Sequence, residues 1–199
     1  MEINKIKKQI NSINKKKSFI QKKEIVEQIK KELNNEEKKL ENEKEILDRK
    51  FYEAVEKNDY EKVKEFLKDG ANIEVKYICD ITPLFNAASD GNKKMVELLI
   101  KNNANINVRT QMGWTPVNMA SSLGHLEVVR VLISNKAELN IPNKYNHTAL
   151  YHSVEKKNKE LENLLINNGA KVSLLEMPES YRKDMFIDFV RIYLKQLVN

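Results

Sequence analysis

Hydrophobic and polar positions recur with a period of 33 residues along the middle of the chain. The stretch Gly113–Ile141 contains a Thr-Pro step, an apolar run with small residues, a Gly-His pair and a second apolar run. The same positions recur before and after it, as in the series Thr82, Thr115 and Thr148 and the series Ala71, Ala104, Ala137 and Ala170. A fixed period of this length is typical of stacked repeats, in which each unit buries its apolar faces against its neighbours.

Each period predicts two short helices, a tight turn and a protruding loop. The first helix carries small residues such as Ala87 and Ala120, which let neighbouring helices approach closely. The second helix carries larger aliphatic residues such as Leu99 and Leu132. The predicted helix pairs are 51–57 with 60–68, 82–90 with 93–101, 115–123 with 126–134, and 148–156 with 159–167. Asp59 is a good N-cap, and Gly70 suits the left-handed residue that ends a helix.

These residues resemble the ankyrin repeat family, whose motif runs Thr-Pro-Leu-His, small residues, Gly-His, a Val/Leu run, Gly-Ala and Asn. The resemblance covers about residues 48–173 as four units, namely 48–79, 80–112, 113–145 and 146–173. It implies an all-α ankyrin-repeat solenoid of helix-turn-helix-loop units with a long N-terminal helical extension. The chain departs from the motif histidine at Phe85, Asn118 and Tyr151, from the turn glycine at Asn58 and Lys157, and from the loop glycine at Asn103 and Lys136.

Residues 1–47 are predicted to form a basic helical extension without a globular core. Isoleucines follow three-four spacing at Ile3, Ile6, Ile10, Ile13 and Ile20, and a seven-residue spacing then links Val26, Leu33, Leu40 and Leu47, with Ile29 between them and Glu36 and Glu43 at matching positions. The seam is compatible with a coiled coil through which copies self-associate. It is equally compatible with a solvated helix that packs one face on the first repeat.

Residues 174–199 do not continue the repeat. Pro178 suits a first helical position, and a broad apolar face follows it at Tyr181, Met185, Phe186, Phe189, Val190, Tyr193, Leu194 and Leu197. We expect a C-terminal capping helix over the open end of the stack, because repeat arrays need covered ends. The alternative is an amphipathic helix offered to a partner.

The net charge of +6 is unevenly placed along the chain. Residues 1–23 carry eight lysines and one glutamate, a net charge of +7, so the remaining residues sum to about −1. The basic segment could contact an anionic membrane or nucleic acid, or simply keep a charged helix soluble. A second hypothesis for the function is therefore an adaptor tethered by this segment.

Chemistry-bearing residues are sparse, and we expect neither an enzyme, nor a metal site, nor a cofactor. The one cysteine, Cys79, cannot form an internal disulfide or a zinc cluster. His147, the nearest candidate base for a Cys79 nucleophile, is about two repeats away, and His125 belongs to the repeat motif. The chain shows no apolar run long enough to span a bilayer and no secretory signal. These features predict a cytoplasmic protein, with delivery into a host cell left open.

The resemblance implies a protein-binding scaffold rather than a catalyst. Partner contacts in the family fall on the loop tips and on the exposed side of the first helices, which together line the concave face. Carried over by position, this set comprises Lys76, Ile78, Ile81, Asp90, Arg109, Gln111, Met112, Trp114, Leu123, Lys144, Tyr145 and His147. We expect Ile81, Met112, Trp114 and Tyr145 to matter most, because they lie where the fold does not require an apolar group. Large rigid side chains such as the Trp114 indole dominate binding energy. The alternative is that Trp114 packs on a neighbouring loop.

Overall fold

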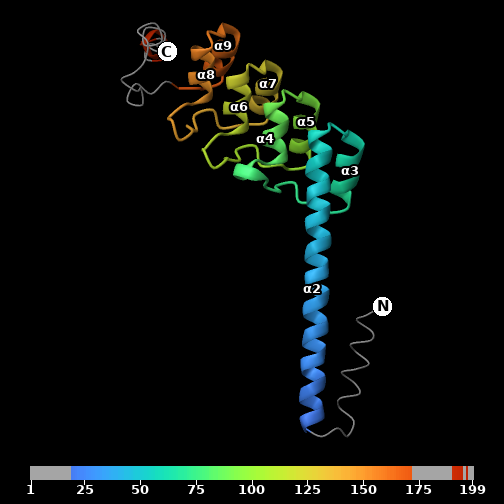
Figure 1. The fold of residues 1–199 in the computed structure, drawn as a ribbon. Helices are drawn as coiled ribbons and strands as arrows, with labels where there is room; N and C mark the ends of the chain where they lie inside the picture. Colours follow the sequence, from blue (N-terminus) through green and yellow to red (C-terminus); the bar gives the residue numbers. More distant parts are fainter. Residues whose placement is uncertain (1–18, 172–189, 195, 197–199) are drawn as a thin grey trace. The chain divides into compact units, whose positions relative to one another are not determined.

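The computed structural model describes residues 19–171, 190–194 and 196 of the 199-residue chain. Regular secondary structure over these residues is helical, and none of them lies in a β-strand (Figure 1). The all-α class predicted from the sequence is therefore confirmed. Contacts divide the chain into two units, Met1–Leu47 and Asp48–Asn199.

Most helices of the described part are short and come in pairs. Their bounds are Phe19–Glu56 for α2, Tyr60–Lys68 for α3, Pro83–Ser89 for α4, Lys93–Lys101 for α5, Pro116–Leu123 for α6, Leu126–Ser134 for α7, Ala149–Glu155 for α8 and Lys159–Asn167 for α9, with a 3-10 turn η1 at Ile78–Asp80. None of the helices in the described residues combines the length and apolar composition needed to cross a bilayer.

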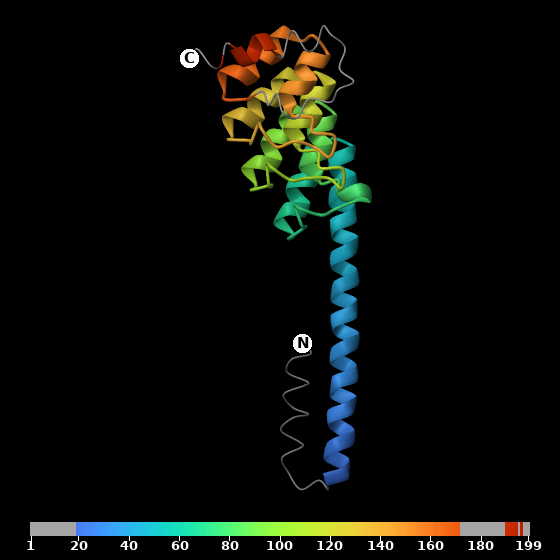
Figure 2. The ribbon, with the colours of Figure 1, turned by 90° about the vertical axis from the view of Figure 1, so that its left-hand side faces the viewer.

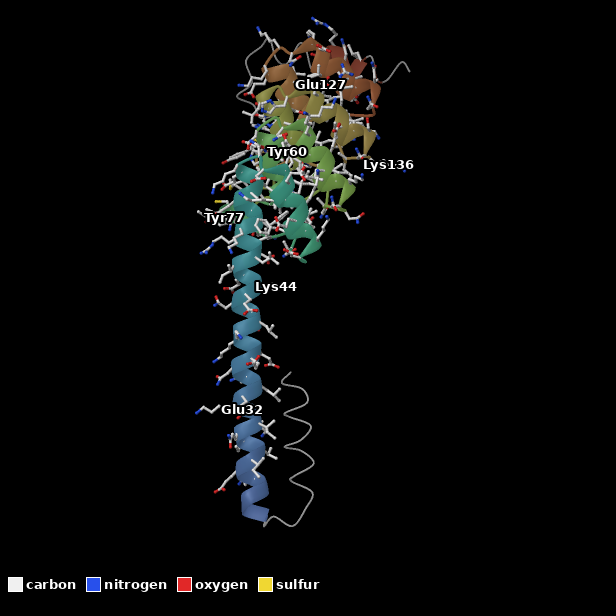
Figure 3. All side chains as sticks on the ribbon, turned by 90° about the vertical axis from the view of Figure 1, so that its right-hand side faces the viewer. Glu32, Lys44, Tyr60, Tyr77, Glu127 and Lys136 are labelled. Atoms are coloured by element: carbon white, nitrogen blue, oxygen red, sulfur yellow. The ribbon has the colours of Figure 1, made fainter. Side chains whose placement is uncertain are left out.

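The first repeat begins differently from the prediction. A separate short helix was expected over residues 51–57, but these residues, apart from Lys57, continue α2 without a break. Neither proline nor glycine interrupts residues 19–56, so nothing in the backbone chemistry ends the helix earlier. In the first unit, Glu32 and Lys44 project from α2 (Figure 3).

Threonine and proline start the first helix of the later repeats. The hydroxyl oxygens of Thr82, Thr115 and Thr148 accept hydrogen bonds from backbone N–H groups three residues later. Each bond satisfies a donor that the helix itself leaves unpaired. Pro83 and Pro116 occupy the first turn, where a missing N–H costs nothing.

Left-handed residues close both turns of every repeat. The helix-to-helix turns have φ of 56° at Asn58, 69° at Gly91, 77° at Gly124 and 55° at Lys157. The turns before the loops have φ of 88° at Gly70, 67° at Asn103, 65° at Lys136 and 90° at Gly169. The motif's turn geometry is thus kept where glycine is replaced. Asparagine adopts this conformation readily, as at Asn58 and Asn103, whereas packing between repeats must offset local strain at Lys136 and Lys157.

The repeats stack as two layers of helices (Figures 1 and 2). One layer contains α4, α6 and α8 in sequence, and in the other layer α5 packs on α7. Buried alanines such as Ala87 and Ala120 bring the first layer close together, while Val96, Leu99 and Leu132 fill the space toward the second layer. Stability therefore depends on contacts between neighbouring repeats, as expected for a solenoid.

Side-chain to backbone hydrogen bonds join the bases of successive loops. Glu74 accepts from the N–H of Asn105 at 2.6 Å, Asn107 from Glu138 at 2.9 Å, and Asn140 from Lys171 at 2.8 Å. The first repeat has no preceding loop, and there Asp48 of α2 accepts from the N–H of Asn72 at 2.6 Å. At the N-terminal end of the stack, Asp48 therefore accepts the hydrogen bond that a loop side chain of the preceding repeat accepts elsewhere.

Ion pairs link the second helices on the outer layer. Lys93 Nζ lies 3.1 Å from Glu127 Oε2, and an Arg130 guanidinium nitrogen lies 3.0 Å from Glu160 Oε1. The side chains of Glu127 and Lys136 are both exposed at the surface (Figure 3). Exposed pairs of this kind contribute little stability individually.

The described C-terminal residues contact the last repeat. The Ile192 side chain is buried, and Gln196 Nε2 donates to the Ala170 carbonyl at 2.8 Å. These are contacts that a capping helix would make. Most of the predicted cap, residues 174–199, lies outside the described residues, so the extent of the cap stays a prediction.

Candidate functional site

The three protruding loops end in tight turns that are closed by equivalent backbone hydrogen bonds. Backbone hydrogen bonds close them between Tyr77 N and Ile81 O at 2.9 Å, Thr110 N and Trp114 O at 3.0 Å, and Asn143 N and His147 O at 3.1 Å. We refer to residues 76–81, 109–114 and 142–147 together as the loop-tip surface. Its three segments occupy equivalent positions of successive repeats.

Backbone hydrogen bonds also join one tip to the next. Gln111 donates its N–H to the Cys79 carbonyl, and Lys144 donates its N–H to the Met112 carbonyl, both at 3.0 Å. The two bonds repeat in register, because both donors and both acceptors are 33 residues apart. Each tip is thus held by its own turn and by its neighbour, which fixes the spacing of the side chains it presents.

Apolar side chains are exposed along this surface. Ile78 is 74% exposed, Tyr145 is 56% exposed and Met112 is 40% exposed. Tyr77 is also exposed, and its ring stacks on that of Tyr52 with centroids 4.9 Å apart. Sequence reasoning did not single out Tyr77, although its position beside Ile78 in a loop was a usable signal. Burial raises the pKa of the Tyr52 phenol to about 12, so this ring stays neutral.

The structure brings together ten of the twelve predicted partner-binding residues. The ten on the loop-tip surface are Lys76, Ile78, Ile81, Arg109, Gln111, Met112, Trp114, Lys144, Tyr145 and His147. Asp90 and Leu123 do not join them, because they lie at the carboxyl ends of α4 and α6. The length of α6 separates Leu123 from the tip by about 12 Å.

Charged residues at the tips also make contacts within the chain. An Arg109 guanidinium nitrogen donates to the Pro142 carbonyl at 3.0 Å and so links two loops. Lys76 Nζ lies 3.6 Å from Asp80 Oδ1. Lys144 is exposed. Arg109 therefore helps to hold the surface together, whatever else it contacts.

An aromatic cluster supports the second and third tips, residues 109–114 and 142–147. The Trp114 indole stacks on the His152 imidazole at 4.8 Å between centroids, and the His147 imidazole stacks on the Tyr151 ring at 3.7 Å. The rings of His147 and His152 meet edge to face at 5.6 Å. Trp114 is only half-buried, but it packs within the fold. This corrects the expectation that the fold does not require the indole.

Burial sets the protonation of both histidines in the cluster. Loss of hydration lowers the pKa of His152 from 6.5 to about 4, and the Glu155 carboxylate, 3.5 Å from Nδ1, offsets part of this shift. Burial also lowers the pKa of His147. Among the described residues, neither ring nitrogen of His152 makes a hydrogen bond of good geometry, because the contact with Glu155 is long. At neutral pH the cluster is therefore uncharged, and it packs as an apolar support.

Other predicted features fall outside this surface. The Nε2 atom of His125 lies 2.9 Å from the Ser89 carbonyl oxygen, so this motif histidine links two neighbouring repeats. Within the described residues, no three His, Cys, Asp or Glu side chains gather as they would to hold a metal ion. The predicted membrane or nucleic-acid contact by residues 1–23 lies almost entirely outside the described residues.

Comparison with known families decides the classification. A family model described as ankyrin repeats (3 copies) matches residues 51–143 and, in an overlapping match, residues 105–175. The matches together span more than half of the chain. The chain belongs to the ankyrin-repeat family. No curated protein matches it. Ankyrin repeats are generally protein–protein interaction modules and are typically not enzymes, so the loop-tip surface is the natural place to look for a partner site.

Proposed function

We propose that this ankyrin-repeat protein is a non-enzymatic scaffold that binds a protein partner through the loop-tip surface and the adjoining part of the first helices, up to Asn86 in α4 and Met119 in α6. One observation carries the proposal. Within residues 48–171, the exposed large apolar side chains are Tyr77, Ile78, Met112, Leu123 and Tyr145, and all except Leu123 lie on the loop-tip surface. Apolar groups gathered on one exposed surface are typical of interaction sites.

The rigidity of the surface supports the same function. Backbone hydrogen bonds fix each turn and couple it to the next, so little conformational freedom is lost when a partner docks. Asn86 of α4 and Met119 of α6 are partly exposed at equivalent positions, and they extend the surface onto the first helices. The equivalent residue of α8, His152, is buried under Trp114 and does not contribute.

The experiment replaces three exposed apolar side chains together, as Ile78→Ser, Met112→Ser and Tyr145→Ser in one variant. Proteins retained by the wild-type chain are identified, and the affinity of the purified partner for each variant is then measured. We expect at least a thirtyfold loss of affinity, corresponding to about 2 kcal/mol for the loss of central apolar contacts.

Leu123→Ser is the matched control, because it removes one exposed apolar group away from the loop tips. It should leave both affinity and melting temperature unchanged. If the triple variant keeps its affinity while Leu123→Ser loses it, the binding surface is at the other end of the first helices. If the triple variant melts well below the wild type, the tip side chains serve the fold instead.

A further inference from the structure

Helix α2 exposes a line of aliphatic side chains in the first unit. Val26 is 43% exposed, Leu33 is 44% exposed and Leu40 is 62% exposed, and they lie seven residues apart on one face. Such a line, on a helix whose other described exposed side chains are polar, is typical of a face that pairs with another helix. The charges beside the line restrict which helix can pair with it.

The seven-residue spacing defines the positions on each side of the line. With Val26, Leu33 and Leu40 at heptad position a, position d holds Ile29, Glu36 and Glu43, position e holds Lys30, Glu37 and Lys44, and position g holds Ile25, Glu32, Lys39 and Ile46. Residues at e and g flank the contact between paired helices, and their charges set partner and orientation.

A parallel pair with a second copy is electrostatically unfavourable. In that arrangement, each g residue meets the e residue of the next heptad on the other helix. Glu32 would meet Glu37 of the second copy, and Lys39 would meet Lys44. Both contacts occur twice by symmetry. Glu36 would also face Glu36 of the second copy inside the contact.

An antiparallel pair reverses these signs, because e then meets e and g meets g. In one register Leu40 faces Ile29 of the second copy. The facing flanking pairs are then Lys30 with Glu37, Glu32 with Lys39, and Ile25 with Ile46, each occurring twice by symmetry. One unfavourable pair, Lys23 with Lys44, falls at the ends. The overlap runs from residue 22 to residue 47, about 39 Å of helix.

We propose that α2 pairs with α2 of a second copy of this chain, antiparallel and in this register. The exposed aliphatic line provides the apolar contact, and the two kinds of opposite-charge pair select the orientation. In this register Glu36 faces Leu33 of the second copy, which keeps the association weak. Two copies joined in this way would present two loop-tip surfaces and would gain avidity for a partner that carries two sites.

Disulfide trapping in the full chain tests the orientation. In a Cys79→Ser background, the double variant Ile29→Cys with Leu40→Cys should form a disulfide-linked dimer under mild oxidation, because these residues face each other. The single variant Leu40→Cys should not, because the two residues 40 lie about 16 Å apart along the antiparallel pair. A dimer from Leu40→Cys alone would indicate a parallel pair and overturn the proposal.

Charge reversal, followed by sedimentation equilibrium of the full chain, tests the register. Glu37→Lys should raise the dissociation constant on the order of tenfold, since two attractive pairs become repulsive. Adding Lys30→Glu to that variant should restore the wild-type dissociation constant. Glu36→Leu alone should strengthen the dimer. In a parallel pair, Glu37→Lys would strengthen association instead. A chain that stays monomeric at every concentration would also overturn the proposal.

Discussion

The Trp114 indole lies flat against the His152 imidazole, with ring centroids 4.8 Å apart and planes 16° from parallel. Trp114 belongs to the tip of the third repeat and His152 to the first helix of the fourth. The contact therefore joins two repeats beneath the loop-tip surface. It gives the one tryptophan of the chain a part in the fold that its place in a loop does not suggest.

Trp114→Ala should destabilise the protein. The substitution removes a half-buried ring and uncovers His152, so we expect the free energy of unfolding to fall by about 2 kcal/mol, less than for a fully buried tryptophan. Chemical denaturation of both proteins measures the change. His152→Ala and the double variant complete a mutant cycle, in which the ring contact should show as non-additivity. Fully additive effects would mean that the stacking contributes nothing.

Acid should weaken the fold through His152. The pKa of this imidazole is about 4 in the folded chain against 6.5 unperturbed, so the unfolded state binds more protons between these pH values. Stability is therefore fully present above about pH 6.5 and is lost as the pH falls toward 4, by at most about 3 kcal/mol. His147, whose pKa is also lowered by burial, adds in the same direction.

Denaturation at several pH values between 4.5 and 7.5 checks this dependence. His152→Gln should be less stable than the wild type at pH 7.5 but should lose less stability on acidification. An acid slope that is the same in His152→Gln and in the wild type would rule out this origin.

The periodicity of the sequence predicts most of the fold. The predicted second helices, Tyr60–Lys68, Lys93–Lys101, Leu126–Ser134 and Lys159–Asn167, have these bounds in the structure. The predicted first helices of the later repeats are slightly too long, because the threonine counted as their first residue is the N-cap. Asp90 and Lys156, counted as last residues, are likewise C-caps. The union of the first helix with α2 was missed, since a repeat period marks where a unit begins but not whether the preceding helix stops.

The loop-tip surface can be predicted only in part from the sequence. Repeat positions place Ile78, Met112 and Tyr145 in loops, and the structure finds them exposed. The packing of Trp114 could not be predicted in this way. Its partner His152 is equivalent to Asn86 and Met119, which are partly exposed. A contact between one repeat's loop and the next repeat's helix depends on the particular side chains and not on their shared pattern.

Gly91→Ala should cost more stability than the equivalent substitution Gly124→Ala. Both glycines have positive φ, 69° and 77°, so both variants incur backbone strain of roughly 1 kcal/mol. At Gly91 a Cβ atom would also lie 2.7 Å from Nδ1 of His125, whereas at Gly124 the nearest atom is Asn158 Nδ2 at 4.0 Å. Displacing His125 also breaks its contact with the Ser89 carbonyl, adding about 1 kcal/mol.

Denaturation of the two glycine variants, each with and without His125→Ala, separates these causes. With His125→Ala present, the further cost of Gly91→Ala should fall to that of Gly124→Ala, because only the strain remains. An equal cost of Gly91→Ala in both backgrounds would show that the ring moves aside freely.

Asp48→Ala should destabilise the N-terminal end of the stack. The Asp48 carboxylate accepts from the Asn72 N–H at 2.6 Å, the position that a loop side chain occupies in later repeats. Because the contact is exposed, water can replace part of it, and we expect a loss of about 1 kcal/mol. Asp48→Asn keeps an acceptor oxygen and should retain most of the stability. Hydrogen exchange gives a local readout, since the Asn72 amide should exchange faster in Asp48→Ala than in Asp48→Asn. Equal protection of this amide in the two variants would show that the side-chain oxygen does not hold the first loop.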